Sequence, residues 1–241
     1  MSLPRRAAIA AAFTLLASGA YAAGAAALPG NVAGGDLTGY LRLVVLFASV
    51  SLAPVLLAVL TPFLRIIVVL YFLRAGLGSQ QLLPNPVLMG LAILLTALSM
   101  LGPIRDLNQR ALQPVLAGKL SPARAAVAAE PIARHHFEAH TRAVDLAAML
   151  RYAPPGQNAQ TAALPVLAAA YVLSELRAAF IIGFVIFLPF MVIDLVVAGT
   201  LASLGLTTMP QAMIALPFKI LLLVMVDGWR LLADSLLLSL R

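Results

Sequence analysis

Charged side chains inside apolar runs are the residues of this 241-residue chain whose positions could do chemistry. The stretch SELRAAFIIGFVIFLPFMVIDLVVAG (174–199) places Glu175 and Arg177 at the start of a long apolar run and Asp194 within it. A charged carboxylate at the centre of a bilayer costs at least about 2.5 kcal/mol, so such a group usually has a partner or a function. These charges are therefore candidates for ion pairing, gating or catalysis.

Lys219 is the candidate partner of Asp194. The turn between the last two apolar runs centres near Thr208. Asp194 lies fourteen residues before Thr208, and Lys219 lies eleven residues after it. With a rise of about 1.5 Å per residue, the two side chains should lie at similar depths on antiparallel helices, roughly 4–5 Å apart along the axis. We predict an ion pair or a shared polar network, which either specifies packing or takes part in gating.

Glu175 and Arg177 are two residues apart, so they point to different sides of a helix and cannot pair with each other. We expect each to have its own partner, either a lipid headgroup or a neighbouring subunit.

Asp227 and Arg230 have the i,i+3 spacing of a local pair at a helix end, beside Trp229. The predicted buried charge network consists of Glu175, Arg177, Asp194, Lys219 and Asp227.

Enzymatic and metal chemistry are poorly supported by the sequence. His136 and His140 have the i,i+4 spacing of a helical zinc pair, but Glu138 does not fit the H-E-x-x-H pattern and no third ligand is evident. Asp194 and Asp227 could form the aspartyl dyad of a membrane protease, yet they are expected at different depths of the hairpin. Cysteine is absent, which excludes thiol catalysis and disulfides. We therefore expect that this protein is not an enzyme and that it binds no cofactor and no metal ion.

The composition indicates a membrane protein, because 62% of the residues are hydrophobic and only 10% are charged. The net charge is +7, but the basic residues do not cluster with aromatic ones, so we expect no nucleic-acid partner. A small-solute transporter is disfavoured because no internal repeat is visible.

The first 22 residues have the features of a secretory signal peptide. Arg5 and Arg6 are followed by an apolar stretch at 7–17 and by an A-x-A cleavage motif at 20–22. The alternative is an uncleaved anchor. A cleaved signal would place the mature N-terminus on the periplasmic side of a bacterial cytoplasmic (inner) membrane.

Proline and glycine divide the rest of the chain into four segments: a linker (23–39), apolar helices (40–104), a polar segment (105–163) and a C-terminal helical hairpin (164–241). In the apolar segment we predict helices at 40–60, 62–76 and 87–101, with Thr61-Pro62 and Asn85-Pro86 as start signals and Gly102-Pro103 as an end.

The polar segment holds seven of the sixteen basic residues, four of the nine acids and all three histidines. Helices are predicted there at 122–129 and 131–152. In the hairpin we predict one helix from 165 to about 205, bent at Pro189, and a second apolar run from 211 to 240.

A direct interpretation gives an all-α fold with four spans. Helices interrupted by proline and charge favour burial inside an assembly instead, since irregular backbone at membrane depth needs protein or a water cavity around it.

Three long stretches carry a family resemblance: FLRAGLGSQQLLPNPVLMGLAILLTALSM (72–100), the run at 174–199 quoted above, and IALPFKILLLVMVDGWRLL (214–232). They strongly resemble the FliP/SctR family of type III protein export gates, over about residues 40–240. The signal peptide and the LPFK…VDGW ending resemble the flagellar branch more closely than the virulence (injectisome) branch, which is the alternative.

The resemblance implies a core pore-forming subunit that passes unfolded flagellar proteins across the cytoplasmic membrane. Several copies would assemble with FliQ-type and FliR-type subunits into a multi-subunit helical cone in the flagellar basal body. Much of that assembly would lie toward the periplasm, with FlhA/FlhB-type export proteins as further partners. The buried charges would then lie in contacts with neighbouring helices and have little contact with membrane lipid.

The turn GLTTMPQAM (205–213) resembles the family's methionine-rich loop, which implies a channel gasket formed by Met209 and Met213. Flexible, apolar methionine side chains suit a seal that must yield to varied substrates. Thr207 and Thr208 stand where many relatives carry methionine, so we expect a looser seal or one supplemented by partner residues.

Overall fold

The computed structural model describes residues 58–79, 82–206 and 208–240, together with the isolated positions 40, 44, 47, 48 and 51. The chain divides into two units, Met1–Leu57 and Ala58–Arg241, and the account below concerns the second. The predicted signal peptide, the linker and most of the helix predicted at 40–60 lie outside the described residues.

All regular secondary structure in the described part of the second unit is helical, which confirms the predicted all-α class. The elements are α3 (Phe63–Leu77), α4 (Asn85–Ser99), α5 (Leu101–Leu107), the π-helical turn η1 (Asn108–Leu112), α6 (Gln113–Leu116), α7 (Pro122–His140), α8 (Ala143–Leu150), α9 (Leu164–Ser203), α10 (Gln211–Met225) and α11 (Gly228–Ser239).

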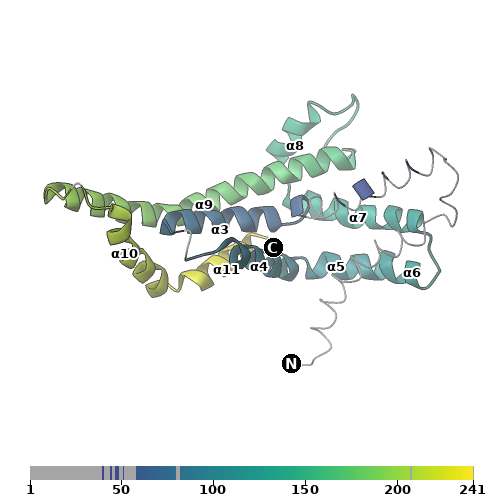
Figure 1. Ribbon diagram of the computed structural model, residues 1–241. Helices are drawn as coiled ribbons and strands as arrows, with labels where there is room; N and C mark the ends of the chain where they lie inside the picture. The colour runs from purple at the N-terminus through teal and green to yellow at the C-terminus, as the bar shows by residue number, and fades with distance from the viewer. Residues whose placement is uncertain are drawn as a thin grey trace. The chain divides into compact units, whose positions relative to one another are not determined.

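The long helix α9 is the element on which the others are arranged (Figure 1). Helices α3, α7, α8 and α10 all pack against it, α4 packs against α3, and α11 contacts α4 and α10. The main core lies where α3 meets α9, α4 and α11, and its most buried members are Ile66, Val69, Leu70, Leu73, Leu88, Ala92, Ala179 and Leu236. Burying each large aliphatic side chain there contributes about 1.5–3 kcal/mol.

Two glycines allow α3 and α9 to approach closely. A Cβ atom on Gly183 of α9 would lie 2.4 Å from the ring of Phe72 in α3, and one on Gly76 of α3 would lie 2.8 Å from the ring of Phe190 in α9. Each helix thus presents a glycine to a phenylalanine of the other. The Phe72 ring also meets that of Phe180 edge to face, with centroids 5.4 Å apart.

The predicted limits of α3 and α9 agree with the structure to within two residues. Pro189 lies inside α9, which continues through it as one α-helix. The predicted caps are wrong: the residues that precede α3 and α4 are Pro62 and Pro84, and neither makes a side-chain cap. The side chain of Asn85 accepts a hydrogen bond from Arg74 instead.

Gly102-Pro103 does not end a helix, contrary to the prediction. The break lies two residues earlier, at Met100, where the axis bends by 62° between α4 and the α5–α6 segment. Pro103 then falls in the first turn of α5, where a missing backbone N–H removes no helical hydrogen bond.

The helix break predicted before Pro131 is also wrong. Helix α7 runs from Pro122 to His140 with Pro131 inside it, after a start at which the Ser121 hydroxyl accepts a hydrogen bond from the backbone N–H of Arg124. The chain breaks instead at Thr141 and Arg142, whose extended backbone separates α7 from α8.

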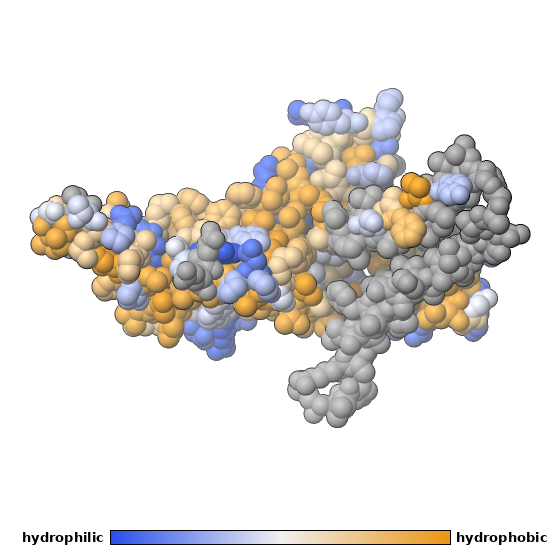
Figure 2. Space-filling view, in the orientation of Figure 1, coloured by the Kyte–Doolittle hydropathy of each residue, from blue (hydrophilic) through white to orange (hydrophobic). Residues whose placement is uncertain are grey.

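By length and composition, α9 is the one unbroken helix of the described residues that could cross a membrane. Two bent pairs are further candidates: α4 with α5–α6, and α10 with α11, the latter bent by 61°. In the described residues, the predicted four-span path therefore has one continuous candidate span and two bent candidates. Apolar residues cover most of the visible face of the α9–α10 hairpin (Figure 2).

Candidate functional site

The Ser-Glu-Leu-Arg sequence at 174–177 is where polar contacts join the helices of this unit. Ser174 and Arg177 are three residues apart and share one side of α9, whereas Glu175 is turned away from them. The first two side chains contact α8, and Glu175 contacts α3. One turn of α9 is thus fixed from two sides.

Glu175 forms a buried ion pair with Arg65 of α3. Its Oε1 lies 2.5 Å from a terminal nitrogen of the Arg65 guanidinium, and the side chains of Arg65 and Glu175 are only 6% and 0% exposed. The other terminal nitrogen of Arg65 donates to the backbone oxygen of Ser239 at 2.6 Å and to its Oγ at 3.1 Å. These extra hydrogen bonds help to offset the desolvation of the two charges, and they connect α3, α9 and α11.

Asp145, in the first turn of α8, is the second buried acid. Its Oδ2 accepts a 2.8 Å hydrogen bond from the Ser174 hydroxyl, which itself accepts one from the backbone N–H of Arg142 at 3.0 Å. The Arg177 guanidinium lies 3.1 Å from the Asp145 Oδ1 as an ion pair. An acid in the first turn also interacts favourably with the helix dipole. These contacts fix α8 to α9.

The ion pair predicted between Asp194 and Lys219 is present. The Lys219 Nζ lies 2.7 Å from the Asp194 Oδ2, with the lysine side chain almost fully buried. Gly78, which ends α3 in the left-handed region at φ 71°, would place a Cβ 3.5 Å from the same Nζ. The ammonium group therefore also lies at the carbonyl end of α3, where the helix dipole favours a cation.

Glu175 and Arg177 each have a partner of their own on a neighbouring helix. Both find their counter-charges within the same chain, in Arg65 and Asp145, because α3 and α8 pack on different sides of α9. Sequence reasoning missed these two residues as partners. Arg65 stands out in the sequence as a lone charge in an apolar helix, whereas Asp145 gives no signal because it lies in the polar segment.

Asp227 does not belong to a buried network in this chain, contrary to the prediction. It is exposed and has left-handed backbone, φ 50°, in the break before α11. The backbone oxygen of Asp227 accepts a hydrogen bond from the Arg230 N–H at 3.0 Å, but the Arg230 side chain lies 3.7 Å from Asp234, one turn further on.

The histidines belong to an aromatic cluster between α7 and α9. The His136 ring lies 4.7 Å from that of His140 and 5.5 Å from that of Tyr171, measured between centroids. Burial, with a smaller effect of His140 and His135, lowers the pKa of His136 to about 4. No group of three potential ligands that could hold a metal ion occurs within the described ranges. The cluster therefore has a packing role in the observed arrangement.

Met209 and Met213 lie at the tip of the α9–α10 hairpin, in the turn and in the first turn of α10. They are 47% and 73% exposed in the single chain. Their gasket role stays a prediction.

Comparison with known proteins identifies the family. The model described as the FliP family matches residues 46–236. The flagellar biosynthetic protein FliP of Bacillus subtilis is 41% identical over 206 residues, which cover 85% of this chain and 93% of that protein. The proteins of the same name from Caulobacter vibrioides (42% over 197 residues, 81% and 74% covered) and Aquifex aeolicus (37% over 213 residues, 87% and 89% covered) are also similar. The resemblance seen in the sequence is confirmed, and the chain belongs to the FliP family.

Proposed function

We propose that this chain is a core pore-forming subunit of the bacterial flagellar type III export gate, through which unfolded flagellar proteins cross the cytoplasmic membrane. Membership of the FliP family supports a structural part in export. The name flagellar biosynthetic protein, carried by the relatives, supports the flagellar system over the injectisome.

The observation that carries the proposal is the apolar surface that one chain leaves uncovered. The large hydrophobic side chains of the α9–α10 hairpin that are more than half exposed include Phe180, Ile181, Phe184, Val185, Val192, Leu195, Val196, Met213, Phe218, Leu221, Val224 and Met225. Continuous apolar surface of this extent requires lipid or protein to cover it. A multi-subunit assembly would supply that cover.

The internal ion pairs fit the same proposal. Because Arg65, Asp145 and Lys219 neutralise the charges of α9 within the chain, the surfaces left for neighbours are mainly apolar. Further copies of the chain and FliQ-type and FliR-type subunits would then pack on these surfaces, with FlhA/FlhB-type proteins at the cytoplasmic side and lipid around the rim. Met209 and Met213 would form the channel seal at the hairpin tip.

The test is co-expression with FliQ-type and FliR-type subunits, followed by mass measurement of the detergent-purified complex. We expect a discrete complex that contains several copies of the chain. Leu195→Lys should abolish it, because Leu195 is 73% exposed on the hairpin. Val144→Lys is the matched control, since Val144 is 70% exposed on α8, which is not part of the hairpin. A chain that remains a monomer with these partners would contradict the proposal.

A further inference from the structure

The C-terminal end of α11 is a place where backbone carbonyl groups need donors from outside the helix, because the last turn of a helix leaves them without partners. Two of these groups are satisfied locally. The Ser239 hydroxyl donates to the backbone oxygen of Leu236 at 2.7 Å, and the Leu240 N–H donates to that of Leu237 at 3.3 Å. The backbone oxygens of Ser239 and Leu240 themselves lie beyond these contacts.

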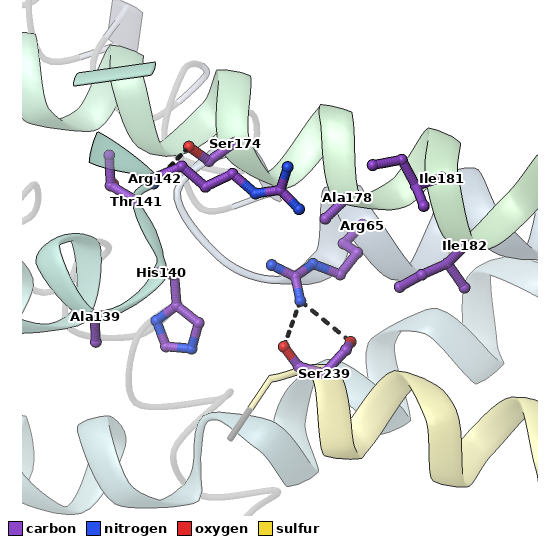
Figure 3. Close-up of a pocket in the computed structure, with 10 residues that line it drawn as sticks. All are labelled: Arg65, Ala139, His140, Thr141, Arg142, Ser174, Ala178, Ile181, Ile182 and Ser239. Carbon is purple, nitrogen blue, oxygen red and sulfur yellow. Dashed lines mark hydrogen bonds between the residues drawn. The ribbon is translucent and has the colours of Figure 1, made fainter. Parts of the chain in front are cut away.

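Side chains from two other helices reach these last two oxygens. A terminal nitrogen of the Arg65 guanidinium lies 2.6 Å from the backbone oxygen of Ser239, and the His140 Nε2 lies 3.1 Å from that of Leu240. Figure 3 shows Arg65 and His140 at the end of α11, reaching it from α3 and α7. The C-terminal end of a helix carries a negative partial charge, so it favours cations. Arg65 is such a cation.

The charge of His140 follows from the second contact of its ring. The Nδ1 lies 2.8 Å from the backbone oxygen of His136, one turn earlier in α7. Carbonyl oxygens only accept hydrogen bonds, and a neutral imidazole has one N–H and one bare nitrogen. A neutral His140 would therefore set a nitrogen lone pair against a carbonyl oxygen at one of the two contacts. The imidazolium form donates from both nitrogens and satisfies both.

Other ionisable groups surround His140 on every side. Those that lie near it or on the elements packed against α7 are His135 and His136 of α7, Tyr171 and Glu175 of α9, Arg65 of α3, Arg142 of the connection to α8, and Arg105, Asp106 and Arg110 of α5 and η1.

These groups do not oppose a charge on His140 strongly. Burial, with a smaller effect of the neighbouring histidines, lowers the pKa of His136 to about 4, so this ring is neutral near pH 7. Arg65 is neutralised by Glu175. Arg142, Arg105, Asp106 and Arg110 are exposed, so water and salt screen their charges. The two carbonyl oxygens are then the closest electrostatic partners of the ring.

We propose that His140 is a proton-binding site and that the bound proton fastens the end of α11 to α7. The contact with Leu240 is complete while the ring is charged, and it is lost as the pH rises and the ring gives up its proton. Histidine is the side chain whose charge changes between about pH 5 and pH 8, so this lock responds to ordinary changes of pH. Its pH dependence has the opposite sign to that of the neutral, buried His136. The assignment does not depend on the proposed export function.

The first test is NMR spectroscopy of the full chain in detergent micelles, labelled with 15N-histidine and carrying no histidine tag. At about pH 6, both ring nitrogens of His140 should have the chemical shift of a protonated nitrogen, whereas His136 should show one protonated and one bare nitrogen. The spectrum of His140→Gln assigns the signals, because those of His140 are missing from it. A single protonated nitrogen on His140 at this pH would refute the proposal.

The second test is hydrogen exchange of the amides in the last turn of α11, corrected for the intrinsic effect of pH on exchange. From about pH 6 to about pH 9, the protection of these amides in the wild type should fall about tenfold, because a charge-assisted hydrogen bond is lost. His140→Arg, which has a permanent charge, should retain protection throughout, and His140→Gln should lack it throughout. His135→Gln is the matched control, since His135 is exposed on the same helix, and should keep the wild-type profile.

Coinciding profiles of the wild type and His140→Arg would overturn the proposal, since the charge of the ring would then not control the end of α11. If His140→Arg does not fold, the comparison of the wild type with His140→Gln decides the question. Equal protection of these two proteins at about pH 6 would refute the lock.

Discussion

At the residue scale, Glu175 and Arg65 depend on each other because both are buried. Glu175→Gln leaves the Arg65 charge without a counter-charge, and we expect a loss of about 3 kcal/mol in the free energy of unfolding. Thermal unfolding of the detergent-solubilised protein measures it. Arg230→Gln is the control, since its pair with Asp234 is exposed and should contribute less than about 1 kcal/mol.

The double variant Arg65→Gln/Glu175→Gln separates the ion pair from the general effect of substitution. The double variant should lose less free energy of unfolding than the two single variants lose together, because no unpaired charge remains. If the two losses add strictly, Arg65 and Glu175 act independently. The ion pair would then not be what joins α3 to α9.

His136 should make stability sensitive to acid. Its pKa in the folded chain is about 4, against an ordinary value of 6.5, so between these two values the unfolded chain binds a proton that the folded chain does not. Stability from this group is therefore complete above pH 6.5 and falls as the pH approaches 4, by at most about 1.4 kcal/mol per pH unit. Unfolding measured from pH 7 to pH 4.5 should show a steeper loss for the wild type than for His136→Phe. Parallel curves would exclude the effect.

The residues that sequence reasoning paired correctly are those joined by a short connection. Asp194 and Lys219 are 25 residues apart on one hairpin, so the helical rise alone places them together. Arg65 and Glu175 are 110 residues apart, and their pairing follows only once α3 is packed on α9. Asp227 was misplaced because the chain breaks there: it lies exposed, with left-handed backbone, just before α11.

At the element scale, the crossing of α3 and α9 depends on glycine. Gly183→Ala would push a methyl group into the Phe72 ring and should destabilise the chain by about 1–3 kcal/mol. Gly199→Ala is the matched control on the same helix, because no atom lies within 4 Å of its added Cβ. It should stabilise the helix by about 0.5–1 kcal/mol. Thermal unfolding of both variants checks the pair, and changes of the same sign would contradict this account of the crossing.

Helices could be predicted where their ends coincide with a local change in composition. The ends of α3 and α9 fall at prolines and glycines that flank apolar runs. The break at Met100 lies two residues before its signal, Gly102-Pro103, and the continuation of α7 through Pro131 has no local signal. Tertiary contacts decide there whether a proline ends a helix or is carried within it.

At the scale of the whole molecule, the hairpin tip is the part expected to close a channel. Replacing Met209 and Met213 by serine should raise the leakage of small ions through the assembled gate, because serine is shorter and polar. Met225→Ser is the control, since Met225 is 76% exposed at the other end of α10. Ion leakage measured in cells or vesicles that contain the gate should rise in the double variant only. Unchanged leakage would remove both methionines from the seal.

The whole-molecule assignment could be made from the sequence because it rests on three long stretches and not on single residues. The matched range, 46–236, includes all three. The sequence did not reveal whether the charged residues of α9 find their partners within the chain or outside it. The chain pairs all three charged residues of α9, namely Glu175, Arg177 and Asp194, within itself.

The length of α9 gives this distribution of contacts a mechanical meaning. Contacts with α3 and with Lys219 continue along α9 from Glu175 through Gly183 and Phe190 to Asp194. About nine residues then separate Asp194 from the end of α9 at Ser203. At about 1.5 Å per residue, that end segment is roughly 13 Å long. A tilt of about 5° at Asp194 therefore displaces its far end by only about 1 Å. The helix is stiffened by α3 over most of its length, so the position of the hairpin tip follows that of α3.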